Sequence, residues 1–269
     1  MDFSKVIFMT DLDGTLLTDD KRILDKDMAA IARFREGGGI FTVATGRGYV
    51  MARRIVEDVL HLNVPSVLFN GAGVFDFKEN RFLWKCEIGA QAREYIRRLN
   101  ALFPEKLGFE VLHEQSVFVP FMNRTEREHL EMESVIPDRR ALDDIPEGGW
   151  LKFVIAAEPC YLDEVQKTVE AGGYEETHWV RSAPMYFECL PKGVDKSRGF
   201  SELIRILGAE NRFSVAAGDY MNDTAMIQKA DLGVAVASAQ ESVKQAADLV
   251  VCDNNSGAIS EIIDYIANL

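Results

Sequence analysis

The chain has 269 residues, of which 47% are apolar and 27% are charged, and its net charge at pH 7 is −13. This length is long for one hydrophobic core and suits two domains. The acidic excess argues against a nucleic-acid partner or an anionic membrane, because both require a basic surface. No stretch approaches the ~20 apolar residues of a membrane span, and the N-terminus lacks a signal-peptide pattern, so we expect a cytoplasmic protein.

The first ninety residues alternate strand and helix patterns. Short apolar runs at 5–11 and 40–47 are typical of buried strands, and the stretch 65–76 is interpreted as a third strand that runs into a turn. Amphipathic segments at 24–39 and 48–60, which are typical of helices, separate them. Apolar strands that are joined by helices indicate a parallel sheet covered on both faces.

The middle of the chain has a different pattern. Strands of mixed polarity are expected at 81–88, 109–121, 150–157 and 185–191, and helices at 90–103 and 162–173. After residue 191 the pattern of the first segment returns and continues to the C-terminus. The predicted fold class is therefore α/β, with a doubly wound, Rossmann-like parallel-sheet core and an inserted α/β domain. The core comprises residues 1–82 and 191–269, and the insert comprises residues 83–190.

Two carboxylates follow the first predicted strand, at Asp11 and Asp13. Residues i and i+2 of a strand point the same way, so both side chains can converge at the carboxyl end of that strand. Open parallel sheets bind their ligands at this edge. Two close carboxylates repel unless a cation lies between them, so the pair suits either a metal site or a nucleophile beside an acid. Taken alone, the Asp11 and Asp13 pair fits a turn that caps a helix about as well as it fits a functional site.

A second acidic cluster follows the strand predicted at 213–219. It contains Asp219, Asn222 and Asp223, although Asp223 also suits a helix cap. Carboxylates at the ends of two strands of one sheet would concentrate negative charge at one rim. Oxygen ligands in a small site favour magnesium, so the sequence predicts Mg²⁺ there.

Two further stretches suit a phosphate group. Thr45 and Gly46 follow the second strand and offer a hydroxyl and backbone N–H groups at the start of a helix. Lys196 lies in the first turn of a later helix, where the helix dipole disfavours a cation, so it needs an anionic partner. Lys192 is the rival, although a solvated loop lysine is the simpler interpretation. The four histidines are interpreted as surface or packing residues, with a substrate contact left open for one of the three in the insert.

In combination, the motifs DLDGTLL, ATGR, FNGAGVFD, KGVDKSRG and GDYMNDTAM resemble the haloacid dehalogenase-like phosphatase superfamily, and most closely its Cof-type branch. The match covers the core, about 160 residues. The resemblance implies a phosphoric monoester hydrolase that acts on small phosphorylated metabolites such as sugar phosphates, with the insert as a cap over the catalytic rim.

The resemblance also assigns roles to residues. Asp11 would be the nucleophile that forms an aspartyl-phosphate, and Asp13 the general acid and base. Thr45, Gly46, Lys196 and Asn222 would contact the phosphoryl group or its surroundings. Mg²⁺ would bind Asp11, the backbone carbonyl of Asp13, and Asp219, with Asp223 holding its waters.

Three alternatives stay open at this point. A phosphomannomutase-like enzyme would share the nucleophile but return the phosphoryl group to the sugar. A receiver-like signalling module also uses aspartates at strand ends, although this chain has Asn70 where such a module has its phosphorylated aspartate. A phosphate-binding protein without catalysis is the third. Tyr220 departs from the small or polar residue usual in the family, and we expect its ring to narrow the entrance to the site or to contact the substrate.

Overall fold

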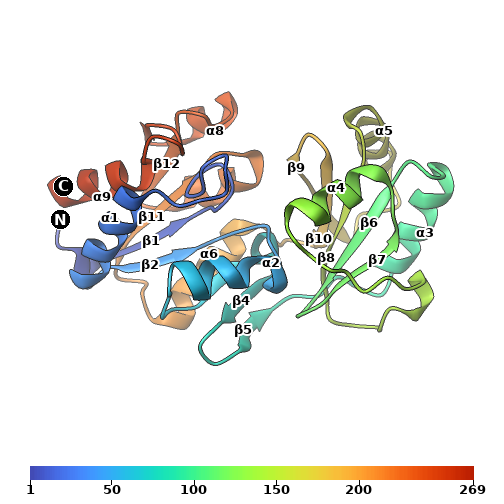
Figure 1. Cartoon of the computed structure of the whole chain (residues 1–269), viewed down its shortest axis with the longest axis horizontal. Coiled ribbons are helices and arrows are strands. Elements are labelled where there is room, and N and C mark those ends of the chain that lie inside the picture. Colours follow the sequence, from blue (N-terminus) through green and yellow to red (C-terminus); the bar gives the residue numbers. More distant parts are fainter.

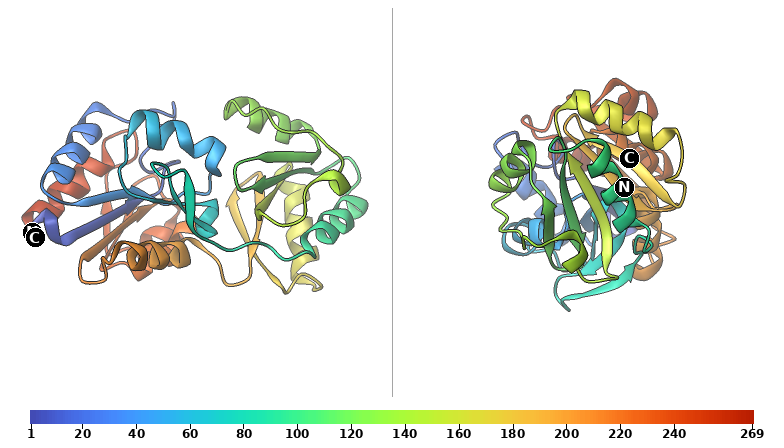
Figure 2. Two further views of the ribbon diagram at one scale, coloured as in Figure 1. Left: turned by 90° about the horizontal axis from the view of Figure 1, so that it is seen from below. Right: turned by 90° about the vertical axis from the view of Figure 1, so that its right-hand side faces the viewer.

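The computed structural model describes residues 1–269 as two α/β bodies that lie side by side (Figure 1). The first body contains both ends of the chain, and the second is built from the middle of the chain. The N-terminal amino group donates a hydrogen bond to the carbonyl of Ile266 (3.0 Å), so the two ends meet, and they do so at the end of the molecule opposite the second body (Figure 2). None of the helices combines the length and the apolar character that crossing a membrane requires.

The first body is organised around a five-stranded parallel sheet. Its strands run in the order β13-β12-β11-β1-β2, and every neighbouring pair is parallel. The whole of β1 is buried, as expected for a central strand covered on both faces. The bounds are β1 (Val6–Thr10), β2 (Ile40–Val43), β11 (Phe213–Gly218), β12 (Leu232–Val236) and β13 (Leu249–Val251).

Helices cover both faces of this sheet, which confirms the doubly wound fold. Phe8 belongs to the apolar cluster that includes residues of α1 and α9, whereas its neighbour Met9 packs with residues of α6 and α7 on the other face. The helices are α1 (Asp25–Glu36), α2 (Tyr49–Arg53, continued by a π-helical segment, Arg54–Val59), α6 (Lys196–Leu207), α7 (Thr224–Lys229), α8 (Glu241–Ala246) and α9 (Ala258–Asn268).

The stretch 65–76, expected to be a strand that runs into a turn, contains two strands with a tight turn between them. β3 (Ser66–Leu68) and β4 (Gly73–Asp76) are antiparallel, and β5 (Arg81–Lys85) pairs with β4. The chain reverses at Asn70 and Gly71, whose φ angles of 51° and 98° lie in the left-handed region. The predicted division at residue 82 falls inside β5, so we propose that the core extends to the end of that strand.

The second body is a five-stranded antiparallel sheet with helices packed on it. Its strand order is β7-β6-β8-β10-β9. The expected strand over 109–121 forms a hairpin, and α4 and β9 were not predicted. The bounds are β6 (Gly108–His113), β7 (Val117–Phe121), β8 (Trp150–Ala156), β9 (Thr177–Ala183), β10 (Tyr186–Pro191), α3 (Ala92–Leu102), α4 (Arg124–Met132) and α5 (Pro159–Glu170).

Strand alternation gives this second sheet two different faces. Phe109 and Phe153 point into an apolar cluster with residues of α3 and α5, which lie on the side away from the first body. Glu110 is next to Phe109 in sequence and Lys152 is next to Phe153, so both point to the opposite face of the sheet. This face is turned toward the first body.

The turn between β3 and β4 should tolerate no side chain at residue 71. A Cβ at Gly71 would collide with the backbone carbonyl of Asp195, just before α6, whereas Gly193 has a similar positive φ but nothing within 4 Å. Gly193→Ala should therefore cost only the left-handed strain of about 1–2 kcal/mol, and Gly71→Ala should cost clearly more. Thermal unfolding of both variants tests this, and equal losses of Tm would contradict it.

Candidate active site

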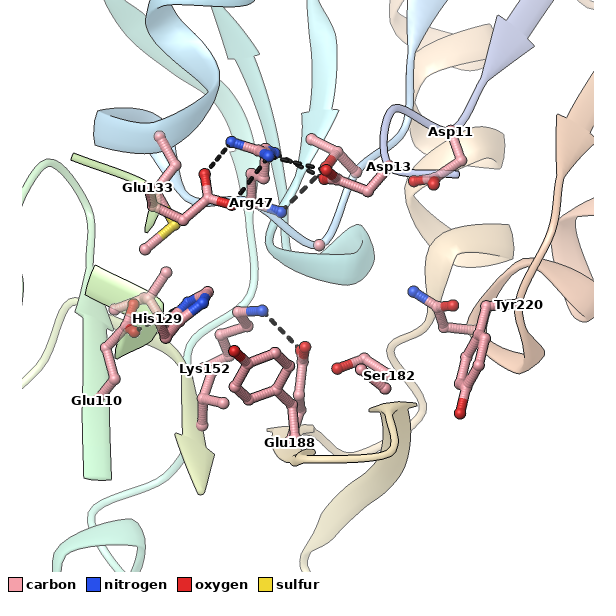
Figure 3. A pocket seen from close by; sticks show the side chains of 18 of the residues that line it. Asp11, Asp13, Arg47, Glu110, His129, Glu133, Lys152, Ser182, Glu188 and Tyr220 are labelled. Carbon is pink, nitrogen blue, oxygen red and sulfur yellow. Dashed lines mark hydrogen bonds and ion pairs between the residues drawn. The ribbon is translucent and has the colours of Figure 1, made fainter. Parts of the chain in front are cut away.

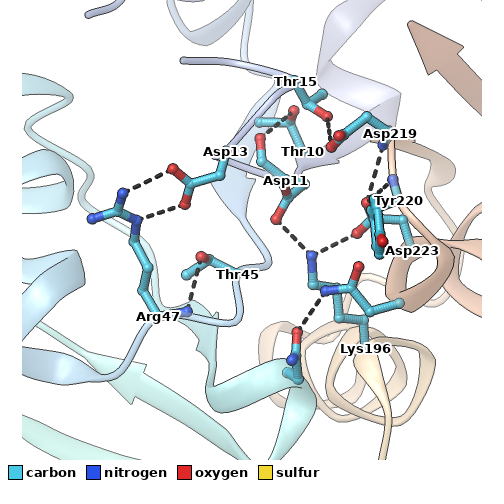
Figure 4. A network of polar contacts seen from close by, with 12 residues as sticks. Thr10, Asp11, Asp13, Thr15, Thr45, Arg47, Lys196, Asp219, Tyr220 and Asp223 are labelled. Atoms are coloured by element: carbon cyan, nitrogen blue, oxygen red, sulfur yellow. Dashed lines mark hydrogen bonds and ion pairs between the residues drawn. The ribbon is translucent and has the colours of Figure 1, made fainter. Parts of the chain in front are cut away.

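The two carboxylates that follow β1 lie at the same rim but bind different cations (Figure 4). Asp11 is 6% exposed, and its Oδ1 accepts a hydrogen bond from Lys196 Nζ at 2.5 Å. Asp13 accepts two hydrogen bonds from Arg47, from Nε at 2.7 Å and from Nη2 at 2.8 Å, and one from Lys21 Nζ at 2.6 Å. Both carboxylates line one cavity, and they form two adjacent ion pairs there.

These different partners give the two carboxyl groups different proton affinities. Burial raises the pKa of Asp11, and nearby Asp223 adds to the rise, although Lys196 opposes it. Burial would also raise the pKa of Asp13, but the hydrogen bonds and charge of Arg47 outweigh it and hold that pKa well below its usual range. Asp13 is accordingly a stable anion here.

Lys196 joins the two acidic clusters. It begins α6, is 1% exposed, and its Nζ also donates to Asp223 Oδ1 at 2.5 Å. Burial would lower the pKa of this ammonium group, but Asp11 and Asp223 raise it above its ordinary value. The sequence predicts an anionic partner for this lysine at a helix N-terminus, and the structure provides two carboxylates, those of Asp11 and Asp223. Lys192, the rival, is largely exposed beside Glu176.

Asp219 and Asp223 follow β11 and are positioned by short-range contacts. The Oδ2 of Asp223 accepts hydrogen bonds from the N–H groups of Asp219 (3.0 Å) and Tyr220 (3.1 Å). Asp219 Oδ1 accepts a hydrogen bond from the hydroxyl of Thr15 at 2.9 Å. Gly14 has a φ of 81°, and a Cβ there would lie 2.5 Å from Asp219 Oδ2, so only glycine leaves that oxygen room.

The carboxylates of Asp11, Asp219 and Asp223 fit a divalent cation. Each offers an oxygen within 4.8 Å of those of the other two. Burial and then the negative charge of Asp223 raise the pKa of Asp219 to about 7, and Thr15 and Lys196 only partly oppose this rise. Carboxylate oxygens are the ligands that Mg²⁺ prefers. The carboxylate of Asp13 lies outside this group.

The cavity lies beside these carboxylates, and Thr45, Gly46 and Asn222 line it together with Asp11, Asp13 and Asp219. The hydroxyl of Thr45 accepts a hydrogen bond from the N–H of Arg47 at 3.1 Å and keeps its own proton for another acceptor. The side chain of Asn222 donates to Asn70 Oδ1 at 2.9 Å. Tyr220 also lines the cavity, which fits the expectation that its ring borders the entrance.

Two core residues connect the first body with the second across the cavity. Arg47 donates to both oxygens of Glu133, which follows α4, while it holds Asp13 (Figure 3). Asn70 donates to Glu188 Oε2 on β10 at 2.6 Å while it accepts from Asn222. Both bodies therefore contribute walls to one cavity, whose volume is about 390 Å³, within the range of small-molecule sites.

The second body supplies residues that sequence reasoning missed. Of the three histidines in the insert, His129 lines the cavity, and burial lowers its pKa to about 4, so the ring is neutral. Asn123 caps α4 by accepting from the N–H of Glu126 at 2.8 Å. An asparagine followed three residues later by a glutamate is a helix-start signal that would have located α4. The other cavity residues of this body include Glu110, Leu112, Glu133, Lys152, Val154, Ser182, Tyr186 and Glu188.

Comparisons with known proteins agree with this arrangement. The family model described as haloacid dehalogenase-like hydrolase matches residues 8–263. The 5-amino-6-(5-phospho-D-ribitylamino)uracil phosphatase YcsE of Bacillus subtilis is 26% identical over 257 residues, covering 95% of this chain and 93% of its own. The pyridoxal phosphate phosphatase YbhA of Escherichia coli is 26% identical over 269 residues, covering 96% and 97%. The crystal structure of a haloacid dehalogenase-like hydrolase from Bacteroides thetaiotaomicron shares the fold, with a TM-score of 0.83 at 23% identity over 97% of this chain and 98% of that one.

Removal of the Lys196 ammonium group should be severely destabilising. In Lys196→Met, Asp11 and Asp223 would face each other in a buried site without their cation, which typically costs about 3–5 kcal/mol. A chain of this size should then lose roughly 10 °C in Tm. Lys192→Met removes a lysine from the turn just before α6 and serves as the control, because its exposed ion pair contributes little. Similar Tm values for the two variants would contradict the buried bridge.

Proposed function

This chain belongs to the haloacid dehalogenase-like hydrolase family as an enzyme of the phosphatase class, and we propose that it hydrolyses small phosphomonoesters with Mg²⁺ through an aspartyl-phosphate on Asp11. One observation carries the proposal. Asp11 lines the cavity with one oxygen held by Lys196, and its other oxygen makes no hydrogen bond within the protein. A restrained carboxylate with a free oxygen suits nucleophilic attack on phosphorus.

Asp13 is the proposed general acid and base. Its protonated form would give a proton to the leaving oxygen when Asp11 attacks, and the resulting anion would take a proton from the water that hydrolyses the aspartyl-phosphate. The ion pairs with Arg47 and Lys21 match the anionic form, which exists between these two steps. The cycle then returns Asp13 to its protonated form.

Thr45, Gly46 and Asn222 are proposed to hold the phosphoryl oxygens. The free proton of the Thr45 hydroxyl, the N–H of Gly46 and the amide of Asn222 all border the cavity. Such donors stabilise negative charge as it moves during phosphoryl transfer. Lys196 would offset the charge of Asp11 as the anionic substrate approaches.

Mg²⁺ is proposed to bind Asp11, Asp219 and the backbone carbonyl of Asp13, with Asp223 holding its waters. Both oxygens of Asp223 already accept hydrogen bonds from protein groups, which supports an outer position for it. When bound, the ion would neutralise charge on the phosphoryl group and lower its repulsion from the nucleophile.

The proposed substrates are small phosphorylated metabolites of the cytoplasm. The two relatives described above are named for phosphorylated small molecules, and a cavity of about 390 Å³ suits a leaving group of comparable size. The second body, which we propose to be the cap over residues from about 86 to 190, would cover the leaving group. The receiver-like alternative does not accommodate a hydrolase-family match over residues 8–263.

Phosphate release from a panel of sugar, nucleotide and cofactor phosphates tests this function. Release should require Mg²⁺ and stop when a chelator removes it. Asp11→Asn should lower turnover by at least about 10⁴-fold while the Tm stays close to that of the parent. Retained Mg²⁺-dependent turnover in that variant would eliminate Asp11 as the nucleophile. Conversion of a sugar phosphate without phosphate release would support the mutase alternative.

Asp13→Asn should separate the two halves of the reaction. Loss of general acid and base catalysis should slow turnover by about 10²–10⁴-fold. If the second half slows most, a phosphate label should accumulate on the protein and be released by hydroxylamine, which cleaves acyl phosphates. The same labelling of Asp11→Asn is the control and should give no such label. A label on both variants would show that another residue is phosphorylated.

A further inference from the structure

The cap wall of the cavity contains a buried carboxyl group without a cationic partner. Glu110 on β6 lines the cavity at 0% exposure, and neither of its oxygens accepts a hydrogen bond from an N–H or hydroxyl group. Glu126 on α4 lies beside it within hydrogen-bonding reach and is equally buried. Burial raises the pKa of Glu110 to about 7 and that of Glu126 well above its ordinary value, so Glu126 holds a proton and Glu110 lies between its neutral and anionic forms at neutral pH.

The nearest basic groups do not neutralise the anionic form of Glu110. His129 Nε2 lies 3.6 Å from Glu110 Oε2, but burial lowers the pKa of His129 to about 4, so the ring is neutral. Lys152 acts on Glu110 through space, yet its Nζ donates to Glu188 Oε2 at 2.6 Å. Figure 3 shows the Lys152–Glu188 pair apart from Glu110 and His129.

The other cationic side chains that line the cavity also form ion pairs with carboxylates. Arg47 is shared between Asp13 and Glu133, and Lys21 contacts Asp13. No lysine or arginine is left to receive a second anionic group of a ligand. The surplus charge on the cap side is therefore at most the single negative charge of Glu110, and a cationic ligand group beside that carboxyl would favour its anionic form. A buried charge of this kind is costly unless a ligand supplies its partner.

We propose that Glu110 binds a protonated amine on the leaving group, so that the preferred substrates are phosphomonoesters of amine-bearing compounds. This inference rests on the proposed phosphatase function, because it concerns the leaving-group end of the same cavity. A charge-assisted hydrogen bond between ammonium and carboxylate would satisfy the unpartnered oxygens of Glu110. A hydroxyl at the same position offers a weaker, neutral donor, and a second anionic group would be repelled.

Two matched pairs of ligands test the inference. Glucosamine 6-phosphate differs from glucose 6-phosphate by an amine in place of a hydroxyl, and pyridoxamine 5′-phosphate differs from pyridoxine 5′-phosphate in the same way. Their Kd values would be measured calorimetrically with Mg²⁺ and the Asp11→Asn variant, which should not turn them over. The amine should bind at least about tenfold more tightly in one pair or both, as expected for one charge-assisted hydrogen bond.

Three further substitutions, each in the Asp11→Asn background, identify the group responsible. Glu110→Gln keeps the shape but removes the charge, so it should abolish the preference for the amine. Glu126→Gln replaces the neighbouring carboxyl group and leaves Glu110 able to bear its charge, so it should preserve the preference even if it costs similar stability. Glu131→Gln, on the exposed side of α4, is the control and should change nothing.

The outcomes separate this inference from the proposed function. Equal binding of amine and hydroxyl ligands, failure of all four to bind, or a preference that survives Glu110→Gln would each overturn the amine site. Phosphate release by the parent enzyme without any amine preference would retain the proposed phosphatase function and reject the amine site. Selective amine binding with no hydrolysis of any ligand would retain the amine site and contradict the proposed function.

Discussion

The buried contact of Lys196 with Asp11 and Asp223 is the interaction on which the remaining arrangement depends. It connects three segments that are distant in sequence: the end of β1, the turn after β11 and the first residue of α6. A lysine at a helix N-terminus is unfavourable by itself because of the helix dipole. Here two carboxylates from neighbouring parallel strands compensate for it. The ion pair therefore requires the parallel sheet, and it orients Asp11, the proposed nucleophile, at the sheet's edge.

The core could be predicted from the sequence because its functional groups follow simple geometric rules. Strands such as β1 are uniformly apolar, which indicates burial on both faces, and the polar residues directly after them must lie at the carboxyl edge of the sheet. Asp11 and Asp219 were found in this way, whereas Lys196 was found because a cation in the first turn of a helix needs an anionic partner. A turn within 65–76 was expected, but the strand β4 after it was not, because the apolar run continues through the reversal at Asn70 and Gly71.

The cap wall could not be predicted, and the reason is physical. Glu110, Lys152 and Glu188 alternate with apolar residues along antiparallel strands, as solvent-facing residues do. Sequence periodicity separates the two faces of such a sheet but cannot tell whether the polar face meets water or another domain. Arg47 was overlooked for a related reason: its neighbours Thr45 and Gly46 fit a local phosphate loop, whereas both of its own partners are distant in sequence.

Arg47 and Asn70 have a consequence for the timing of any cap movement. Each holds a cap glutamate with one part of its side chain and a core residue with another. The cap therefore cannot separate from the core without changing the electrostatic surroundings of Asp13 and freeing a hydrogen-bonding group next to Asn222. Release of the product and recovery of Asp13, the proposed proton-transfer group, would then occur in the same movement. The rate of opening would limit how soon the enzyme can bind its next substrate.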